Sequence, residues 1–236
     1  MKIAYSALTN KGKIRLENQD SLFLVDRRIN EEAFSESGTL DSGESLCFAV
    51  FDGMGGGQCG RDASVLAADL LPLMRTGCSL PAAFSKINAA METYMTDHAL
   101  TLMGTTAAVI VLSGETAELC NIGDSGIYCI YRDRMVRLSE NHSMQIGAGG
   151  KRYLTQYLGI RSEEMQIEPF AQTVRLCSGY RFLLCSDGLT DLVSEPEVGE
   201  LMADASAKDA CEALFARAME HGGKDNISII LIDLID

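Results

Sequence analysis

The sequence predicts an α+β domain in which strands and helices form separate layers. The apolar runs that indicate β-strands are joined by short connections, which favours antiparallel pairing, because parallel strands need long crossovers. The helical patterns are grouped in two blocks instead of alternating with the strands, and this grouping is typical of a layered α+β domain. A chain of 236 residues suits one large domain, so we expect a single domain over residues 1–236.

The first elements are strands separated by polar segments. Residues 2–9 and 21–26 carry strand-like apolar patterns, and the polar segment TNKGKIRLENQD joins them. The stretch 31–45, within NEEAFSESGTLDSGES, is acidic and rich in glycine and serine, so we expect a solvated, disordered turn there. The apolar run SLCFAVF then predicts a strand at 46–52.

Two helices are expected next, at residues 60–75 and 80–100. Apolar residues recur at helical spacing in the first, and the second opens at Ser79 with Pro81 in its first turn. A long helical region at 195–221 precedes the last strand, ISIILIDL. Between these helical blocks lie six short strand patterns, at 105–112, 116–122, 126–131, 134–138, 166–175 and 180–186.

The composition argues against several classes of partner. A formal net charge of −13 and a pI near 4.7 repel nucleic-acid backbones and anionic lipids, and no basic patch opposes this field. No apolar stretch is long enough to span a bilayer, and the first residues lack a signal-peptide pattern. The eight cysteines are scattered singly, which indicates reduced, packed thiols. We therefore expect a soluble cytoplasmic protein with no nucleic-acid and no membrane partner.

Aspartates recur where the predicted strands end, beside glycines or other small residues. Each alone is an ordinary turn signal, but rigid strand ends would aim several of these short carboxylates into one cleft. Carboxylates gathered in this way cannot all stay ionised without cations. Because histidines are few and no cysteines are paired, Mg²⁺ or Mn²⁺ fits this set better than zinc. The aspartates are Asp20, Asp52, Asp124, Asp187, Asp191 and Asp225.

The stretch FDGMGGG, which starts at Phe51, carries the densest glycines in this set. Glycines this close together indicate that a ligand or another chain segment approaches the backbone. Asp52 can supply a side-chain ligand to a metal ion. Gly53 can supply an exposed carbonyl oxygen, because it has no Cβ in the way.

Six motifs follow one another between residues 15 and 228: R-x-x-N-Q-D, D-G-M-G-G, G-T-T, G-D-S, S-D-G-L-T-D and G-x-D-N-x-[ST]. In this order they resemble the metal-dependent protein phosphatases of the 2C type, especially the compact bacterial ones, over almost the whole chain. The resemblance implies a four-layer α-β-β-α sandwich of two antiparallel sheets, with one catalytic domain. It also implies phosphoprotein substrates, and a Ser/Thr protein kinase with its targets as partners.

The resemblance implies two Mn²⁺ or Mg²⁺ ions at one end of the sandwich, with a water held between them that attacks phosphorus. Asp52 is similar to the carboxylate that bridges both ions, and Gly53 to the carbonyl ligand. Asp187 and Asp225 match the remaining direct ligands of the first ion.

Further roles follow from the same resemblance. Asp20 matches a carboxylate that acts through bound water, and Asp191 a second one of this kind. Asp124 together with Asp187 resembles the pair that holds a third, weaker ion in bacterial members. Arg15 matches the arginine that grips the substrate phosphate with its fork of donors. The catalytic residues expected on this basis are Arg15, Asp52 and Asp187.

Two departures from the family pattern affect the expected proton donor and the expected shape of the cleft. Met54 stands where some members have a histidine that protonates the leaving group, and Gly57 stands where relatives with methionine usually have one. This leaves water as the expected proton donor. Between His142 and Leu158 the chain has only a short glycine-containing link, where bacterial relatives carry a long flap. We expect a more open cleft with altered substrate selection, and a structural, hydrogen-bonded His142.

Three alternatives compete with the phosphatase. Gly55, Gly57 and Gly60 spell G-x-G-x-x-G, but a dinucleotide site would need a parallel strand where a helix is expected. Cys211 and Arg217 have the C-x5-R spacing of cysteine-dependent phosphatases, yet the residues between them favour a helix over a phosphate loop. A non-catalytic, phosphoprotein-binding relative remains the main alternative, although loss of a metal aspartate would be its mark.

Overall fold

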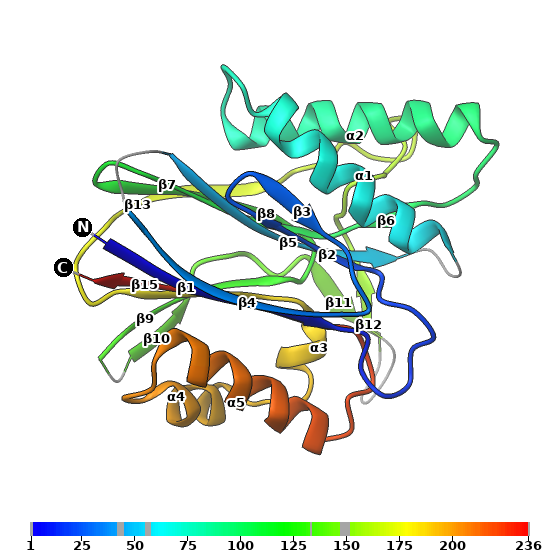
Figure 1. Cartoon of the computed structure of the whole chain (residues 1–236). Coiled ribbons are helices and arrows are strands. Elements are labelled where there is room, and N and C mark those ends of the chain that lie inside the picture. Colours follow the sequence, from blue (N-terminus) through cyan, green and yellow to red (C-terminus); the bar gives the residue numbers. More distant parts are fainter. Residues whose placement is uncertain (1, 42–44, 55–57, 133, 147–151, 236) are drawn as a thin grey trace.

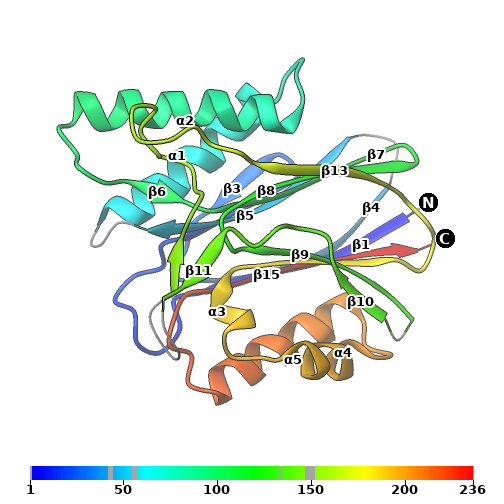
Figure 2. The same cartoon turned by 180° about the vertical axis from the view of Figure 1, so that it is seen from behind.

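Two antiparallel sheets lie face to face, and helices cover the outer face of each, as Figure 1 and the view from behind in Figure 2 show. This computed structural model describes residues 2–41, 45–54, 58–132, 134–146 and 152–235. The layers follow the order α-β-β-α, so the expected α+β four-layer sandwich with two antiparallel sheets is confirmed.

The first sheet has six strands and contains both the first and the last strand of the chain. β1 and β15 lie side by side in it, in register from Lys2 opposite Ile235 to Asn10 opposite Ile227. The order across this sheet is β10 (Arg134–Arg137), β9 (Gly126–Tyr131), β14 (Arg181–Cys185), β15 (Ile227–Ile235), β1 (Lys2–Asn10) and β4 (Ala33–Asp41).

The second sheet has seven strands, and a short hairpin stands beside it at one end of the sandwich. Six strands of this sheet run in the order β13 (Phe170–Arg175), β8 (Thr116–Ile122), β7 (Ala107–Ser113), β5 (Leu46–Met54), β2 (Asp20–Leu24) and β3 (Arg27–Ile29). The two-residue β6 (Gly104–Thr105) pairs with the end of β5. The hairpin consists of β11 (Ser143–Gln145) and β12 (Arg152–Leu154).

The helices form the two outer layers (Figure 1). α1 (Gln58–Met74) and α2 (Leu80–Asp97) cover the second sheet. α3 (Asp187–Thr190), α4 (Glu195–Met202) and α5 (Ala207–Glu220) lie on the side of the first sheet. In the described parts of the chain, no helix is both long and apolar enough to cross a membrane.

The central strands carry long apolar runs because both of their faces are covered. In β5, Phe48 and Val50 pack between the two sheets, whereas Phe51 packs toward α1 and α2. In β15, Ile230 points into the layer between the sheets, and Leu231 points toward the helices on the other side. Strands buried on both faces read as continuous apolar runs, as SLCFAVF and ISIILIDL do.

The stretch 31–45 was wrongly expected to be a disordered turn, because most of it forms the edge strand β4. This strand pairs with β1 along its whole length, and Phe34 and Leu40 pack against the core between the sheets. The hydroxyl of Tyr5 donates to Glu36 Oε1 over 2.7 Å. This edge strand partly buries only alternate side chains, and most of its polar residues, which misled the prediction, lie at the exposed positions.

Two other expectations need correction. The helical region at 195–221 is two helices, because the chain turns at Asp204, which has a φ of 55°, before Ser206 caps α5. The Ser206 hydroxyl accepts the N–H of Asp209 over 3.2 Å. The link between His142 and Leu158 contains the hairpin of β11 and β12, which had not been foreseen. The other predicted helices and strands are present, with ends shifted by a few residues.

Candidate active site

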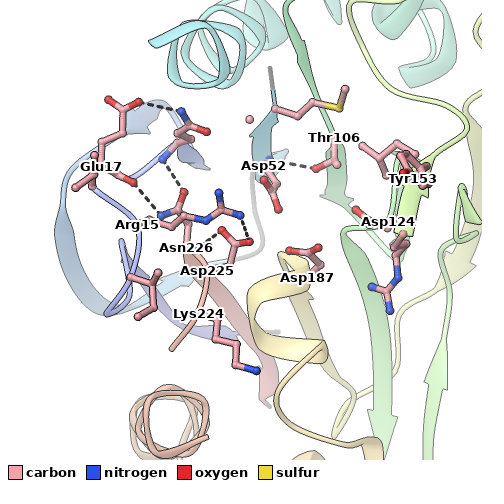
Figure 3. A pocket seen from close by; sticks show the side chains of 17 residues that line it. Arg15, Glu17, Asp52, Thr106, Asp124, Tyr153, Asp187, Lys224, Asp225 and Asn226 are labelled. Carbon is pink, nitrogen blue, oxygen red and sulfur yellow. Dashed lines mark hydrogen bonds and ion pairs between the residues drawn. The ribbon is translucent and has the colours of Figure 1, made fainter. Parts of the chain in front are cut away.

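A cavity of about 1050 Å³ opens at the end of the sandwich that carries the short hairpin (Figure 3). Its lining comes from the loop between β1 and β2, the ends of several strands, β12 and the first residue of α3. Two predicted residues, Asp20 and Asp191, lie outside this lining. Six of the eight predicted site residues line the cavity: Arg15, Asp52, Gly53, Asp124, Asp187 and Asp225.

Asp20 and Asp52 are brought together by strand register. They occupy directly opposed positions of β2 and β5, which places their side chains on the same face of the sheet. Asp20 is fully buried, and its Oδ2 accepts a hydrogen bond of 2.8 Å from the hydroxyl of Ser186. Its Oδ1 is buried and has no hydrogen-bond partner among the described residues. Two adjacent carboxylates with an unsatisfied oxygen form a site that favours a cation.

Two glycines allow backbone segments to meet at the floor of the site. A Cβ on Gly53 would lie 2.0 Å from the carbonyl oxygen of Gly60, at the start of α1. A Cβ on Gly188 would lie 1.9 Å from the carbonyl oxygen of Asn226. The prediction that another chain segment passes close to the glycines after Asp52 is therefore confirmed for Gly53. Gly57 and Gly55 lie outside the described residues.

Asp187 and Asp225 face the same central space as Asp52 (Figure 3). Asp187 follows β14 and begins α3, and Asp225 precedes β15, so two neighbouring strands of the first sheet deliver them. Asp225 Oδ1 accepts the N–H of Asn226 over 2.8 Å. Its Oδ2 accepts a bond of 2.5 Å from Arg15 Nη2.

Arg15 lies on the loop between β1 and β2, on one side of the cavity (Figure 3). Asn226 fixes this loop, because its Nδ2 donates to the carbonyl oxygens of Lys11 and Glu17 over 3.1 and 3.0 Å. The bond to Asp225 raises the pKa of Arg15. A guanidinium has five N–H donors, so donors remain for a ligand oxygen in the cavity.

Asp124 lies across the cavity from Arg15, at the start of β9 (Figure 3). Arg152, from β12, also lines the cavity and donates to Asp191 Oδ1 over 2.5 Å. Asp191 itself is exposed and is held at the margin of the site by this ion pair. Burial raises the pKa of Asp124, and the positive charge of Arg152 offsets only part of this rise.

Burial and mutual repulsion raise the pKa values of four acidic residues at this site. Burial raises the pKa of Asp20 to about 7. Burial, followed by the charges of Asp124 and Asp191, raises the pKa of Asp187 to about 8. Burial and the charge of Asp20 raise the pKa of Asp52 well above its ordinary value. Without cations, the folded chain therefore favours the protonated form of these carboxyl groups at pH values where aspartate is ordinarily ionised.

This donor set fits divalent cations. The fit rests on the unsatisfied Asp20 Oδ1, on the raised carboxyl pKa values and on the carboxylate side chains among those that line the cavity. In the described stretches, no three Asp, Glu, His or Cys side chains approach one another closely enough to hold one ion between them. The carboxylates therefore face the same cavity, but no three of these described side chains converge on one position for an ion.

Sequence reasoning assigned no role to the residues that position the carboxylates. Thr106 Oγ1 accepts the N–H of Asp52 over 3.1 Å, and the hydroxyl of Thr105 donates to the Asp52 carbonyl oxygen over 3.0 Å. Asn226 Oδ1 accepts the N–H of Gln19 over 2.9 Å. The motifs G-T-T and G-x-D-N-x-[ST] contain these residues, so the signal was present in the sequence. Arg152 had no such signal, because its place depends on the hairpin.

The histidines and the C-x5-R pair lie outside the site. His142 is buried, and its Nδ1 accepts the N–H of Gly123 over 3.2 Å, so the structural role expected for it is confirmed. His98 and His221 cap the C-terminal ends of α2 and α5. Cys211 is buried within α5, and this burial raises the pKa of its thiol to about 12, which disfavours the thiolate that a nucleophile needs. Antiparallel pairing in the second sheet likewise contradicts the dinucleotide fold.

Comparisons with known proteins agree with this fold. The serine/threonine phosphatase stp of Listeria innocua is 25% identical, with 95% of this chain and 93% of that protein covered. Protein phosphatase PhpP of Streptococcus pneumoniae is 30% identical, with 97% and 96% covered.

The crystal structure of the serine/threonine phosphatase PstP/Ppp of Mycobacterium tuberculosis superposes with a TM-score of 0.82 at 24% identity, over all of both chains. A second structure, of the catalytic domain of PstP in complex with two manganese ions, gives a TM-score of 0.75. The sequence model of protein phosphatase 2C matches residues 27–231, which is most of the chain. This chain belongs to the protein phosphatase 2C family.

Proposed function

We propose that this protein is a metal-dependent protein phosphatase that hydrolyses phosphoserine and phosphothreonine. The observation that carries the proposal is the meeting of acidic side chains from distant segments at one cavity, with raised carboxyl pKa values that call for cations. The names of the Listeria and Streptococcus relatives, both protein phosphatases, support the same activity. In this family the cavity would receive the phosphorylated side chain of a protein substrate.

Two Mn²⁺ or Mg²⁺ ions are the proposed cofactors. Asp52, Asp187, Asp225 and the Gly53 carbonyl are the proposed direct ligands. When bound, such ions neutralise phosphoryl charge and lower the pKa of the water that attacks phosphorus. The relative whose structure contains two manganese ions supports this choice.

The outer residues of the site have proposed roles as well. Asp20 and Asp191 would act through water. A third ion would lie at Asp124 and Asp187. These three assignments rest on the family motifs and on the positions of the side chains around the cavity.

The residues of this chain have separate tasks in the reaction. Arg15 would bind two phosphoryl oxygens with its guanidinium while Asp225 holds it in place. Thr105 and Thr106 fix the backbone of Asp52, which keeps its carboxylate aimed into the cavity. No histidine is among the described residues that line the cavity, so solvent water would protonate the leaving oxygen.

The proposal extends to the organisation and setting of the protein. Residues 1–236 would act as a single catalytic domain, which is supported by the pairing of β1 with β15 across the sequence. The phosphoproteins that it hydrolyses are made by a Ser/Thr protein kinase, so such a kinase and its targets are the proposed partners. Eight free cysteines support a reducing, cytoplasmic setting.

The test is hydrolysis of p-nitrophenyl phosphate and of a phosphothreonine peptide with added Mn²⁺. We expect turnover that EDTA abolishes and that Asp187→Asn reduces at least about a hundredfold, as expected for loss of a group that acts directly on the reacting centre. The control is Asp97→Asn, which removes an exposed carboxylate at the end of α2 and should leave the rate unchanged. Phosphopeptide binding without turnover in the wild-type protein would contradict the proposal and favour a binding module.

A further inference from the structure

Large apolar side chains surround the mouth of the catalytic cavity. Ile14 and Leu16, on either side of Arg15, are 67% and 96% exposed, yet both line the cavity. Tyr153, from β12, lines it on the opposite side, as Figure 3 shows. Met144 lies directly opposite Tyr153 in the hairpin and is also exposed, so its side chain stands on the same face. We call Ile14, Leu16, Met144 and Tyr153 the apolar rim.

The exposed large hydrophobic side chains are not spread evenly over the described surface. Among the described residues, eleven large hydrophobic side chains are exposed, and three of them line this one cavity. Single exposed apolar residues need no explanation, but a group around one opening marks a contact surface. The rim therefore indicates what the cavity mouth binds.

The loop that carries Leu16 is held by hydrogen bonds and not by packing of its apolar side chains. The N–H of Lys13 donates to the carbonyl oxygen of Gly223 over 2.8 Å. Asn226 Nδ2 holds the carbonyl oxygens of Lys11 and Glu17, one on each side of Leu16. The backbone therefore presents Leu16 to solvent in a fixed position, where it is ready to contact a bound chain at little cost in ordering.

We propose that the apolar rim binds apolar side chains on both sides of the phosphorylated residue, so that the preferred substrates are phosphopeptide segments with apolar flanks. This inference rests on the proposed function, because a phosphoryl group that enters the cavity places its neighbouring residues across the mouth. Ile14 and Leu16 contact the flank on one side, and Met144 and Tyr153 contact the flank on the other. The rim residues are uncharged, and the net charge of −13 opposes acidic flanks.

The experiment measures binding and chemistry separately. Two fluorescent peptides carry a hydrolysis-resistant phosphonate in place of phosphoserine, one with leucine and valine on both flanks and one with serine and glycine. Their affinities for the Mn²⁺-loaded protein are measured by fluorescence anisotropy. The variants are Ile14→Ser with Leu16→Ser, and a matched control, Leu73→Ser, which replaces a leucine of α1 that is 69% exposed. Hydrolysis of p-nitrophenyl phosphate, which has no flanks, reports the chemistry.

We expect the wild-type protein to bind the apolar peptide about fivefold to tenfold more tightly than the polar one. The double variant should lose this preference, whereas Leu73→Ser should keep it and should hydrolyse p-nitrophenyl phosphate at the wild-type rate. Equal affinities for the two peptides, or a preference that survives in the double variant, would overturn the inference even if hydrolysis is normal. Absence of hydrolysis with a preserved peptide preference would refute the proposed function and leave the rim supported.

Discussion

Arg15 is held by Asp225, and it can also bind a ligand in the cavity. Its guanidinium donates to Asp225 and lies at the edge of the cavity, where its remaining donors are available to an anionic oxygen. The same contact explains why a lysine would not replace it, because an ammonium group is a point charge and not a planar fork. Arg15 is thus positioned by a carboxylate that is itself a proposed metal ligand.

Substitution of Arg15 by lysine tests the value of the fork. We expect Arg15→Lys to weaken competitive inhibition by inorganic phosphate about tenfold or more, because one charged hydrogen bond contributes roughly 1.5–3 kcal/mol. The inhibition constant for phosphate against p-nitrophenyl phosphate gives the readout. Arg175→Lys serves as the control, since Arg175 is an exposed residue of β13 that pairs with Glu115. A phosphate affinity that does not change in Arg15→Lys would show that the arginine does not contact the phosphoryl group.

The residue types of the site could be predicted from the sequence, but the way they are arranged could not. The six motifs named Asp52, Asp187 and Asp225, and all three line one cavity. The direct opposition of Asp20 to Asp52 depends on the register of β2 against β5, and no local pattern encodes it. The salt bridge that ties Arg152 to Asp191 depends on a hairpin that was not foreseen.

At the scale of the elements, the site depends on the close contact between the start of α3 and the segment before β15. Gly188, at the start of α3, lets the helix lie against the segment before β15, which carries Asp225. The sequence does not show which segment packs against this glycine, although the motif S-D-G contains the glycine itself. The helices and the central strands were easier to predict, because their apolar patterns are long and regular.

Two glycine variants test whether the close contact at Gly188 matters. We expect Gly188→Ala to lower the free energy of unfolding by about 2–4 kcal/mol and to weaken Mn²⁺ binding, because the new Cβ would lie 1.9 Å from a backbone oxygen. Gly199→Ala, in α4, is the control: no atom lies within 4 Å of its Cβ, and alanine favours the helix by about 0.5–1 kcal/mol. Urea denaturation measures the free energy of unfolding of both variants. Equal stability of the two variants would contradict the close packing at Gly188.

The edge strand β4 shows that amino-acid composition alone can fail to identify a strand. Its acidic, serine-rich sequence resembles a solvated connection, but every second side chain faces the sheet interior or a neighbouring strand. Phe34 and Leu40 are spaced by an even number of residues and so lie on one face, which is the signal that could have identified the strand. The signal was weak because only two large apolar residues carry it.

At the scale of the whole molecule, the cluster of raised carboxyl pKa values couples stability to pH. The folded-state pKa values of Asp20 and Asp187, about 7 and about 8, lie above the ordinary value for aspartate. The folded protein without metal therefore holds these protons more tightly than the unfolded chain. Their contribution to stability is complete below the ordinary pKa and is lost as the pH rises through the folded-state values.

It follows that divalent ions should stabilise the protein most at alkaline pH. We expect the rise in Tm on adding Mn²⁺ to be several degrees larger at about pH 8 than at about pH 5.5, because the ions then replace the charge that protons supply at low pH. Thermal unfolding with Mn²⁺ or EDTA at both pH values measures this, with NaCl at matched ionic strength as the control. An equal rise in Tm at the two pH values would mean that the raised carboxylates do not bind the ions.

The place of β15 between β14 and β1 has a consequence for biosynthesis. A ribosome delivers this strand after every other element described here, yet the first sheet cannot close without it. Until residues 227–235 leave the exit tunnel, β1 lacks one hydrogen-bonded neighbour and Asp225 has no strand to anchor it. A nascent chain therefore acquires its catalytic cavity only after residues 227–235 have left the exit tunnel, and chaperones that shield the unpaired edge of β1 should associate with it until then.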